Sequence, residues 1–352
     1  MKTFFRKNIL QMSGYVPGEQ PQKSKIVKLN TNENPFPPTP KIKKFLINFD
    51  ISKLRLYPDS LCSELRKLIA KKFQIKPSNI IVGNGSDDIL NIITRCCADE
   101  TNPISYFEPS YSLYSVLAKI QAAKCIPIPL EKDFSIPRKI PDEIFKAKLI
   151  FIVRPNAPSG NNFPKDIIKK ICLKAKGIVL IDEAYADFSE DNCIDMAINM
   201  DNVVVCRTLS KSYSLAGIRL GFAIANENII SQMMKVKDSY NVCRLSQEIA
   251  KIAITDENHF KKNIKKIIKN RTKLIENLKN LNFNVIDSQT NFIFTSPPDN
   301  FKLNAEQIYN YLKKNGIYVR YFKGKVTENY LRITVGTEEE NKKLIDNLKH
   351  IQ

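Results

Sequence analysis

The chain has 352 residues, of which 43% are hydrophobic and 26% are charged, and its formal net charge is +19. This composition excludes a disordered or fibrous protein, and the length predicts one large domain plus a smaller one. No apolar run approaches the roughly 20 residues that cross a bilayer, and the N-terminal sequence lacks a signal-peptide pattern. We therefore expect a cytoplasmic protein without a membrane partner, whose eight cysteines, none of them in a CxxC pair, are reduced.

The charge pattern and the two histidines restrict the chemistry. Lysines are spread along helical stretches, which indicates a solvated surface rather than a nucleic-acid interface. A nucleic-acid binder is the distant alternative. Because His259 and His350 are the only histidines, catalysis by histidine and a His-rich metal site are close to excluded, and we expect no bound metal. Lys, Asp, Tyr and Arg must carry the chemistry.

The first part of the chain is expected to contain an arm, a rigid segment and a helix. Residues 1–28 read as a polar arm, and the proline-rich segment NTNENPFPPTP at 30–40 cannot form a regular helix. We expect that segment to line a site. The stretch 60–73 predicts a helix that Asp59 or Ser60 caps. Its apolar face would consist of Leu61, Leu65, Leu68, Ile69 and Phe73.

From residue 80 onward, short β-rich runs alternate with helical stretches, which is typical of a mostly parallel sheet sandwiched by helices. The runs LIFIV and IVLI are apolar at every position, as expected for strands that are buried on both faces. After about residue 240 the pattern changes to that of an α+β unit. Its expected elements are long helices at 244–280, strands near 291–295, 317–321 and 331–335, and a final helix. We therefore predict a large α/β domain at 29–243 and a small α+β domain at 244–352 that the N-terminal segment joins.

In such a sheet, ligands bind beyond the carboxyl ends of the strands, so the residues that follow each apolar run are site candidates. Gly83 and Gly85 free the backbone before a helix that starts at Ser86 and Asp87, and this turn can present backbone N–H groups to a phosphate. Asp88 stands where a dinucleotide-binding fingerprint needs its third glycine. An ordinary tight turn is an equally good interpretation.

Two further strand ends carry polar residues. Asn156 lies between Pro155 and Pro158, so it either belongs to a rigid loop or is held to donate a hydrogen bond to a ligand. Asp182 follows four apolar residues, and an ionised carboxylate at that position needs a positive partner. A protonated pyridine nitrogen would serve, and a core salt bridge is the structural alternative.

The most specific pattern is RTLSKSYSLAGIRLGF, in which small hydroxyl residues surround Lys211 and Arg219 follows eight positions later. The hydroxyl residues are Thr208, Ser210, Ser212 and Ser214. Hydroxyls and a guanidinium next to an amine nucleophile predict a site for a monophosphate. Because a free lysine has a pKa of about 10.4, burial or neighbouring cations must lower that pKa for catalysis near neutral pH.

The chain resembles the fold-type-I aminotransferases that use pyridoxal phosphate, and more narrowly the histidinol-phosphate aminotransferase family. Nine sequence blocks follow the family's order nearly from end to end. They are LNTNENP, LYPD, VGNGSDD, EPSY, RPNAPSG, IDEAY, RTLSKSYSLAGIRLGF, YNVCRLSQ and LRITVGT. The resemblance implies a fold-type-I transferase with pyridoxal 5'-phosphate as its cofactor and a homodimer as its assembly.

The resemblance also implies a role for each matching residue. Lys211 would bind the cofactor as a Schiff base and shuttle a proton, and Asp182 would pair with the pyridine nitrogen. Tyr185 and Asn156 would bind the phenolic oxygen, and Tyr111 would stack on the ring. The cofactor phosphate would contact the backbone of Ser86 and Asp87, the side chains of Thr208, Ser210 and Arg219 and, across the dimer, Tyr57. The substrate would contact Tyr15, Asn32, Arg320 and Arg332.

The reaction that the resemblance implies is transamination of L-histidinol phosphate with 2-oxoglutarate, a step of histidine biosynthesis. Its products are imidazole-acetol phosphate and glutamate. A lyase that decarboxylates threonine phosphate and a broad aromatic aminotransferase are the alternatives. All three enzymes would share the same cofactor site, so the cofactor residues do not distinguish them.

Overall fold

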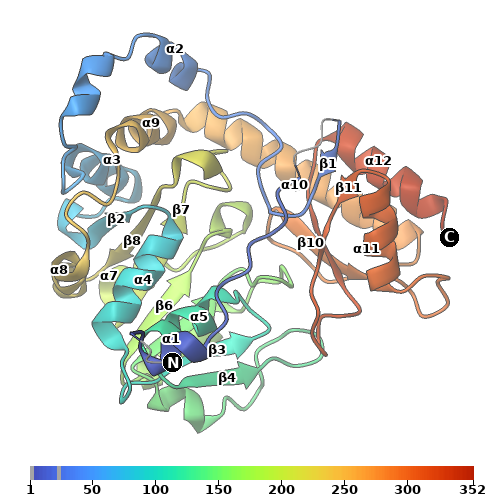
Figure 1. Cartoon of the computed structure of the whole chain (residues 1–352), viewed down its shortest axis with the longest axis horizontal. Helices are drawn as coiled ribbons and strands as arrows, with labels where there is room; N and C mark the ends of the chain where they lie inside the picture. The colour runs from blue at the N-terminus through green and yellow to red at the C-terminus, as the bar shows by residue number, and fades with distance from the viewer. Residues whose placement is uncertain (1–3, 22–24) are drawn as a thin grey trace.

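The computed structural model describes residues 4–21 and 25–352 (Figure 1). Residues 1–3 and 22–24, which fall in the arm expected at 1–28, lie outside the described residues. A large α/β unit surrounds one sheet, and the C-terminal part of the chain forms a smaller unit beside it (Figure 1). Within the described ranges, no helix is long and apolar enough to cross a membrane.

The large sheet has seven strands in the order β2-β8-β7-β6-β5-β3-β4. They are β2 (Ile80–Gly83), β3 (Ile104–Glu108), β4 (Cys125–Pro129), β5 (Leu149–Val153), β6 (Ile178–Asp182), β7 (Val203–Thr208) and β8 (Gly221–Ala225). β8 runs antiparallel to its neighbours β2 and β7, and the pairs that β3, β4, β5, β6 and β7 form with one another are parallel. The prediction of a mostly parallel α/β sheet is confirmed.

Helices cover both faces of this sheet. Side chains alternate between the two faces along each strand, so each strand contributes to a hydrophobic core on either side. In β5, Ile150 and Ile152 belong to one hydrophobic core and Phe151 belongs to the other. The core of Phe151 includes residues of α4 (Ser86–Cys97), α5 (Leu113–Ile120), α8 (Glu227–Val236) and α10 (Glu257–Asn280). The opposite core includes residues of α3 (Ser63–Phe73), α6 (Lys165–Lys174), α7 (Ile194–Asn199) and α9 (Arg244–Thr255).

The smaller unit contains a four-stranded antiparallel sheet in the order β12-β13-β10-β9. Its elements are β9 (Asn284–Val285), β10 (Phe292–Ser296), α11 (Ala305–Lys314), β12 (Arg320–Tyr321), β13 (Leu331–Thr334) and α12 (Glu338–Lys349). A parallel pair of β1 (Val27–Lys28) and β11 (Ile317–Tyr318) lies beside it. The N-terminal segment therefore contributes a strand to the C-terminal part of the chain.

The N-terminal arm is attached to the large unit through α1 (Lys7–Gln11). Arg6 donates a hydrogen bond to the carbonyl of Ile120 at 2.9 Å, and Asn8 donates to that of Lys119 at 2.7 Å, at the C-terminal end of α5. The other short elements are α2 (Lys41–Ile47), η1 (Ile51–Arg55), η2 (Pro77–Asn79), η3 (Asp142–Lys146), η4 (Ala186–Phe188) and η5 (Ala216–Ile218).

The helix expected at 60–73 is shorter than predicted, because α3 begins at Ser63. Cys62 adopts a left-handed backbone with φ 49°, which interrupts the helix before that point. Asp59 accepts hydrogen bonds from the N–H groups of Leu61 at 2.9 Å and Ser63 at 2.6 Å, so it closes the preceding turn. Leu61 lies outside the helix with 49% of its surface exposed, and its assignment to the buried face was wrong.

Candidate active site

Five of the parallel-running strands deliver candidate residues to one edge of the large sheet, because their carboxyl ends point the same way. β6 ends at Asp182, and β7 ends at Thr208 just before Lys211. The loops after β2, β3 and β5 carry Ser86, Tyr111 and Asn156. The sequence alone placed these residues at strand ends, and the sheet order brings those ends together.

Lys211 is a half-buried lysine whose amine donates a hydrogen bond to the backbone carbonyl of Thr31 at 3.2 Å. Burial is the main reason that its pKa falls from 10.5 to about 8, and the positive charge of Arg332 lowers it further. Asn34 fixes the backbone here, because its amide donates to the Lys211 carbonyl at 3.0 Å. The lysine therefore carries an amine that deprotonates far more readily than a solvated one.

Asp182 is buried at the end of β6 and has both carboxylate oxygens hydrogen-bonded. Its Oδ1 accepts from the N–H of Ala184 at 3.1 Å, and its Oδ2 accepts from the hydroxyl of Tyr114 at 2.9 Å. Burial raises the pKa of this carboxyl to about 6. The structural alternative of a core salt bridge is wrong for Asp182, because the buried carboxylate that pairs with an arginine is that of Glu183, with Arg207 at 2.8 Å.

Tyr185 and Asn156 are buried polar residues whose contacts leave capacity for a ligand. The Tyr185 hydroxyl accepts a hydrogen bond from the amide of Asn32 at 2.9 Å. The Asn156 amide donates to Ser159 Oγ at 2.7 Å, while its Oδ1 is buried and has no hydrogen-bond partner among the described residues. An unpaired buried oxygen costs free energy unless a ligand or water reaches it, so Asn156 indicates a binding position.

A cradle of hydrogen-bond donors lies between α4 and the loop that follows β7. Thr208 donates to Ser210 Oγ at 2.9 Å, and Arg219 reaches the same oxygen at 3.4 Å. The backbone at Gly85 has φ +88°, and a Cβ at that position would lie 2.5 Å from Arg219 Nη2, so only glycine fits. The N-terminus of the 12-residue helix α4, which starts at Ser86, supplies free N–H groups to an anion.

Tyr111 and Asp87 stand at the side of this cradle. The Tyr111 hydroxyl donates to Asp87 Oδ1 at 3.2 Å, and Asp87 Oδ2 lies 3.3 Å from Arg219 Nη2. The ring of Tyr15 from the N-terminal arm meets the Tyr111 ring edge-on, with 5.7 Å between the centroids. The arm therefore approaches the position where the resemblance implies that Tyr111 stacks on a cofactor ring.

Tyr57 is the candidate whose contacts do not reach this group. Its side chain is 77% exposed and stacks on Tyr240 with 4.4 Å between the ring centroids. The Arg244 guanidinium donates a hydrogen bond to the backbone carbonyl of Tyr57 at 2.8 Å. The resemblance implies that this tyrosine serves the second subunit, and its exposure is compatible with that role.

Arg320 and Arg332 form the second positive region of the site. They are directly opposite each other across β12 and β13, and both guanidinium groups lie over the ring of Phe322, at 5.4 and 5.2 Å. Arg332 donates to the carbonyl of Asn30 at 3.1 Å, while its Nε is buried without a partner. In the described part of the chain no carboxylate forms an ion pair with either arginine, so the pair is free to bind an anionic ligand.

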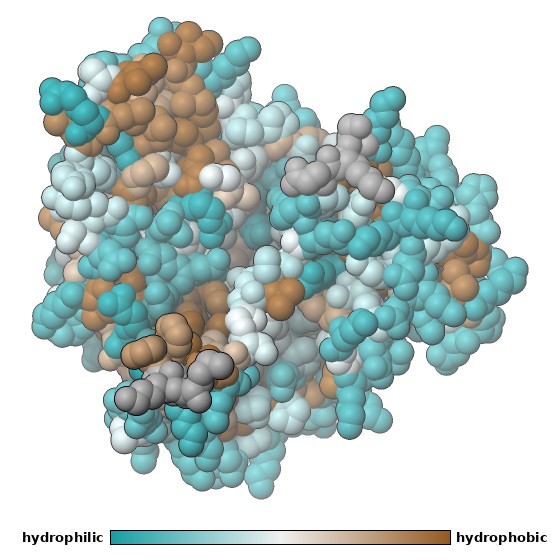
Figure 2. All heavy atoms as spheres, viewed as in Figure 1, coloured by the Kyte–Doolittle hydropathy of each residue, from teal (hydrophilic) through white to brown (hydrophobic). Residues whose placement is uncertain are grey.

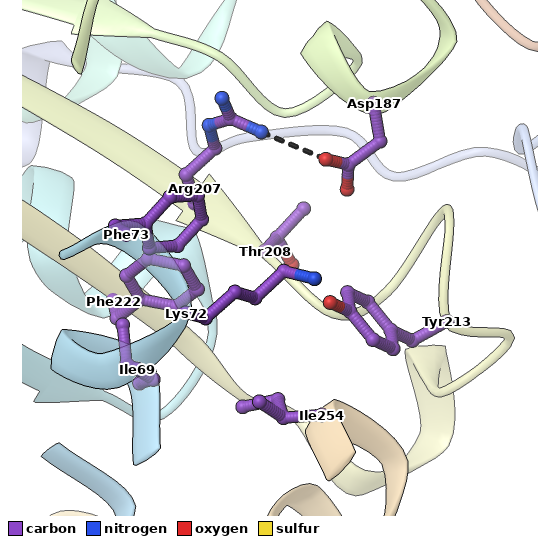
Figure 3. Close-up of a pocket in the computed structure, with 9 residues that line it drawn as sticks. All are labelled: Ile69, Lys72, Phe73, Asp187, Arg207, Thr208, Tyr213, Phe222 and Ile254. Carbon is purple, nitrogen blue, oxygen red and sulfur yellow. Dashed lines mark hydrogen bonds and ion pairs between the residues drawn. The ribbon is translucent and has the colours of Figure 1, made fainter. Parts of the chain in front are cut away.

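An ion pair and a hydrogen bond connect the segment around Lys211 with η4. Arg207 donates to Asp187 at 2.8 Å, and Asp187 also accepts from the hydroxyl of Ser212 at 2.5 Å. Figure 3 shows the first of these contacts at a small cavity that Thr208, Tyr213 and Lys72 also line. This cavity lies on the Arg207 side of the loop, and it does not include Lys211.

Sequence reasoning missed several residues that complete the site. The sequence did not indicate Tyr114 as a site residue, because it occupies one of the apolar positions of a predicted helix. Thr31 and Asn34 belong to the segment 30–40 that was expected to line a site, and both contact Lys211. Asn32, a predicted substrate residue, contacts Tyr185 within a hydrogen-bonded set that includes Thr334.

These residues fit pyridoxal 5'-phosphate by the chemistry of their donors. An amine with a lowered pKa suits an aldehyde, a buried carboxylate without a cation suits a protonated pyridine nitrogen, and the cradle suits a phosphate. Among the described residues, no group of three or more His, Cys, Asp or Glu side chains could hold a metal ion.

Known proteins resemble this chain over nearly its whole length. The family described as "Aminotransferase class I and II" matches residues 24–348. A histidinol-phosphate aminotransferase of Microcystis aeruginosa is 43% identical over 348 residues, which cover 98% of each protein.

Two solved structures share the fold. Histidinol-phosphate aminotransferase from Sinorhizobium meliloti, in complex with pyridoxal-5'-phosphate, matches with a TM-score of 0.88 at 20% identity, covering 100% of this chain and 98% of that one. L-threonine-O-3-phosphate decarboxylase from Porphyromonas gingivalis matches with a TM-score of 0.80 at 21% identity, covering 92% and 99%. Since an aminotransferase and a decarboxylase share this fold, the fold alone does not select the reaction.

Proposed function

Because the chain belongs to the class I and II aminotransferase family, we propose that it holds pyridoxal 5'-phosphate at Lys211 and transaminates L-histidinol phosphate with 2-oxoglutarate. The products are imidazole-acetol phosphate and glutamate. The observation that carries this proposal is one short segment, in which Thr31 accepts from the Lys211 amine and Asn32 donates to the Tyr185 hydroxyl. The 43% identity to a histidinol-phosphate aminotransferase favours this substrate over threonine phosphate.

When bound, the cofactor supplies the electron sink for the negative charge that develops at the substrate Cα. Lys211 would bind the aldehyde carbon of the cofactor. Once released from that carbon, the Lys211 amine would move the proton at the substrate Cα. A pKa of about 8 suits this work, because a base that titrates near the operating pH can both accept and return a proton. Thr31 orients the amine for the transfer.

Asp182 would bind the protonated pyridine nitrogen of the cofactor. Its carboxylate has no cationic partner among the described side chains, and a positive ring nitrogen would favour its ionised form and oppose the effect of burial. Tyr185 and Asn156 would bind the phenolic oxygen, and Tyr111 would stack on the ring. The phosphate would be held by the backbone of Ser86 and Asp87, by Thr208, Ser210 and Arg219, and by Tyr57 of the partner subunit.

Arg320 and Arg332 would bind the anionic end of each substrate in turn. Their guanidinium groups converge on one ring, so a phosphate or a carboxylate between them would neutralise two like charges at once. Tyr15 and Asn32 would line the same pocket. One pair of arginines then serves the phosphate of histidinol phosphate in one half-reaction and a carboxylate of 2-oxoglutarate in the other.

A second copy of this chain is the partner that we propose for an exposed apolar surface around α2 and η1. Figure 2 shows hydrophobic side chains gathered at this end of the molecule, at the top left of the view. The surface consists of Leu46, Ile47, Ile51, Leu54, Leu56, Tyr57 and Leu61, with Tyr240 stacked on Tyr57. A large exposed apolar patch marks an interaction site, and Tyr57 within it would reach the second active site.

The domain boundaries that we propose are 29–243 for the large domain and 244–352 for the small one, joined by the N-terminal segment. We place the enzyme in the cytoplasm, because the eight cysteines, all free, fit a reducing compartment.

The proposed reaction is tested by an amino-transfer assay with 2-oxoglutarate as acceptor. Histidinol phosphate, threonine phosphate and phenylalanine are offered separately, and kcat/KM is measured for each. We expect the highest value for histidinol phosphate. A higher value for phenylalanine would favour the broad aromatic aminotransferase, and release of carbon dioxide from threonine phosphate would favour the lyase.

A further inference from the structure

We propose that Tyr114 is a positioning residue, whose hydroxyl fixes the Asp182 carboxylate for its contact with the cofactor ring. The hydroxyl donates to Asp182 Oδ2 at 2.9 Å, and both residues are buried. The inference rests on the proposed role of Asp182. It adds a residue from α5, which the sequence motifs did not indicate.

The ring of Tyr114 is held on two sides, which fixes the direction of its hydroxyl. It stacks on Phe151 of β5, with centroids 4.4 Å apart and an interplanar angle of 5°. Tyr111 meets it edge-on at 5.7 Å. Tyr111 is the expected stacking partner of the cofactor ring. Its contact with Tyr114 therefore links the expected position of that ring to the Asp182 carboxylate.

Asp182 needs such a donor because its surroundings oppose its charge. Burial raises the pKa of this carboxyl, and the negative charges of Asp87 on α4 and of the neighbouring Glu183 act in the same direction. The hydrogen bonds from Tyr114 and Ala184 oppose that rise. Cys206 of β7, Tyr111 and Tyr185 also interact with this pair, and Tyr185 donates no hydrogen bond to the carboxylate in the described structure.

The two donors to Asp182 also constrain its geometry. The Ala184 N–H lies on the same loop as Asp182, so it fixes Oδ1 only relative to the end of β6. The Tyr114 hydroxyl comes from a different element and therefore sets the rotation of the whole carboxylate. Without it, the second oxygen would have no donor, and the carboxylate could turn away from a ring nitrogen.

The test compares Tyr114→Phe in the wild-type holoenzyme and in the Asp182→Asn background. A hydrogen bond to a charged group corresponds to a factor of about 10 to 100 in an equilibrium constant. We expect Tyr114→Phe to lower kcat by at least about tenfold at nearly unchanged KM for histidinol phosphate, and to raise the cofactor dissociation constant, measured by equilibrium dialysis. Both effects should be absent in the Asp182→Asn background, where no carboxylate remains.

Tyr106→Phe is the matched control, because Tyr106 is a buried tyrosine of the same core, 6.1 Å from the Tyr114 ring, without a hydrogen bond to Asp182. Its kcat and cofactor affinity should equal those of the wild type. The melting temperatures of the variants test whether the phenylalanine ring preserves the packing on Phe151. A drop in Tyr114→Phe larger than the loss of one buried hydrogen bond explains would overturn a purely positioning role.

Two outcomes overturn the inference while leaving the proposed function intact. They are wild-type kcat and cofactor affinity in Tyr114→Phe, and an equal loss in both backgrounds, which would mean that Tyr114 acts through packing. Wild-type kcat in Asp182→Asn itself would instead contradict the proposed role of Asp182, and the inference would fall with it.

Discussion

Arg320 and Arg332 are register partners in the antiparallel strands β12 and β13, so two guanidinium groups leave the small sheet side by side. Like charges directly opposite each other destabilise a sheet. Arg320 accordingly helps to lower the pKa of Arg332, together with the larger effect of burial. An anion bound between the two arginines would remove this repulsion, as expected of the substrate site that we propose.

The first prediction is that Arg332→Ala lowers kcat/KM in both half-reactions. Removing one partner of a desolvated ion pair costs about 2 to 5 kcal/mol, and the Nε of Arg332 is buried. Arg320→Ala should penalise histidinol phosphate more than phenylalanine, because a dianionic phosphate gains more from a second guanidinium than a carboxylate does. Steady-state kinetics with both donors checks this order. Unchanged histidinol-phosphate kinetics in Arg320→Ala would contradict it.

The second prediction concerns the attachment of the cofactor. Lys211→Ala should abolish transamination and remove the visible absorbance of the lysine-bound cofactor, because Lys211 is the lysine beside the phosphate cradle. Residual binding through Arg219 should remain measurable by dialysis. Lys235→Ala is the control, since Lys235 lies on the exposed end of α8 and contacts Gln232. Near-normal turnover in Lys211→Ala would refute the assignment.

The third prediction is a dependence of stability on pH in the cofactor-free protein. The pKa of Lys211 is about 8 in the folded chain, whereas its ordinary value is 10.5. Between these two pH values the folded state therefore binds fewer protons than the unfolded state. Its burial therefore destabilises the fold below pH 8, and the penalty disappears as pH rises from 8 to 10.5. Lys211→Met should raise the free energy of unfolding by up to about 3 kcal/mol at pH 7.

That gain should shrink to a small fraction at pH 10. Urea unfolding of wild type and variant at both pH values measures the difference, and the comparison cancels the groups that titrate equally in both proteins. Lys235→Met should show no such pH dependence, because its side chain is exposed. An equal gain at pH 7 and pH 10 would mean that the amine is not desolvated.

The fourth prediction tests the apolar surface. Ile51 is 75% exposed on η1, and Ile51→Glu with Leu54→Glu should convert a dimer into a monomer in light scattering after gel filtration. Cofactor affinity should fall as well, because Tyr57 of the partner subunit would be lost. Leu173→Glu on α6 is the control, since Leu173 is 69% exposed on a helix away from this surface. A dimer that survives the double substitution would place the interface elsewhere.

Much of the site could be predicted because it follows from local sequence. Parallel strands place their carboxyl ends at one edge, so Asp182, Thr208 and Asn156 were found from apolar runs and the residues after them. Lys211 was found because hydroxyl residues and an arginine surround it within a few positions. These signals need no knowledge of how distant segments pack.

The remainder depends on contacts between distant segments. Tyr114 lies 68 positions from Asp182, and nothing near it in the sequence marks it as a polar partner. The pairing of Arg320 with Arg332 depends on the register of two short strands. Leu61 was misplaced because helical periodicity does not show the left-handed turn at Cys62 that delays the helix.

Because β1 pairs with β11, we expect the N-terminal segment to take its final place late in folding. Thr334 binds the carbonyl of Leu29 at 2.9 Å and the N–H of Asn32 at 3.0 Å, so the segment that contacts Lys211 is fixed only after residue 334 has left the ribosome. The large sheet, complete at residue 225, can form while the chain is still growing. We therefore expect the loops after β2 and β7 to form before the segment that contacts Lys211 is fixed.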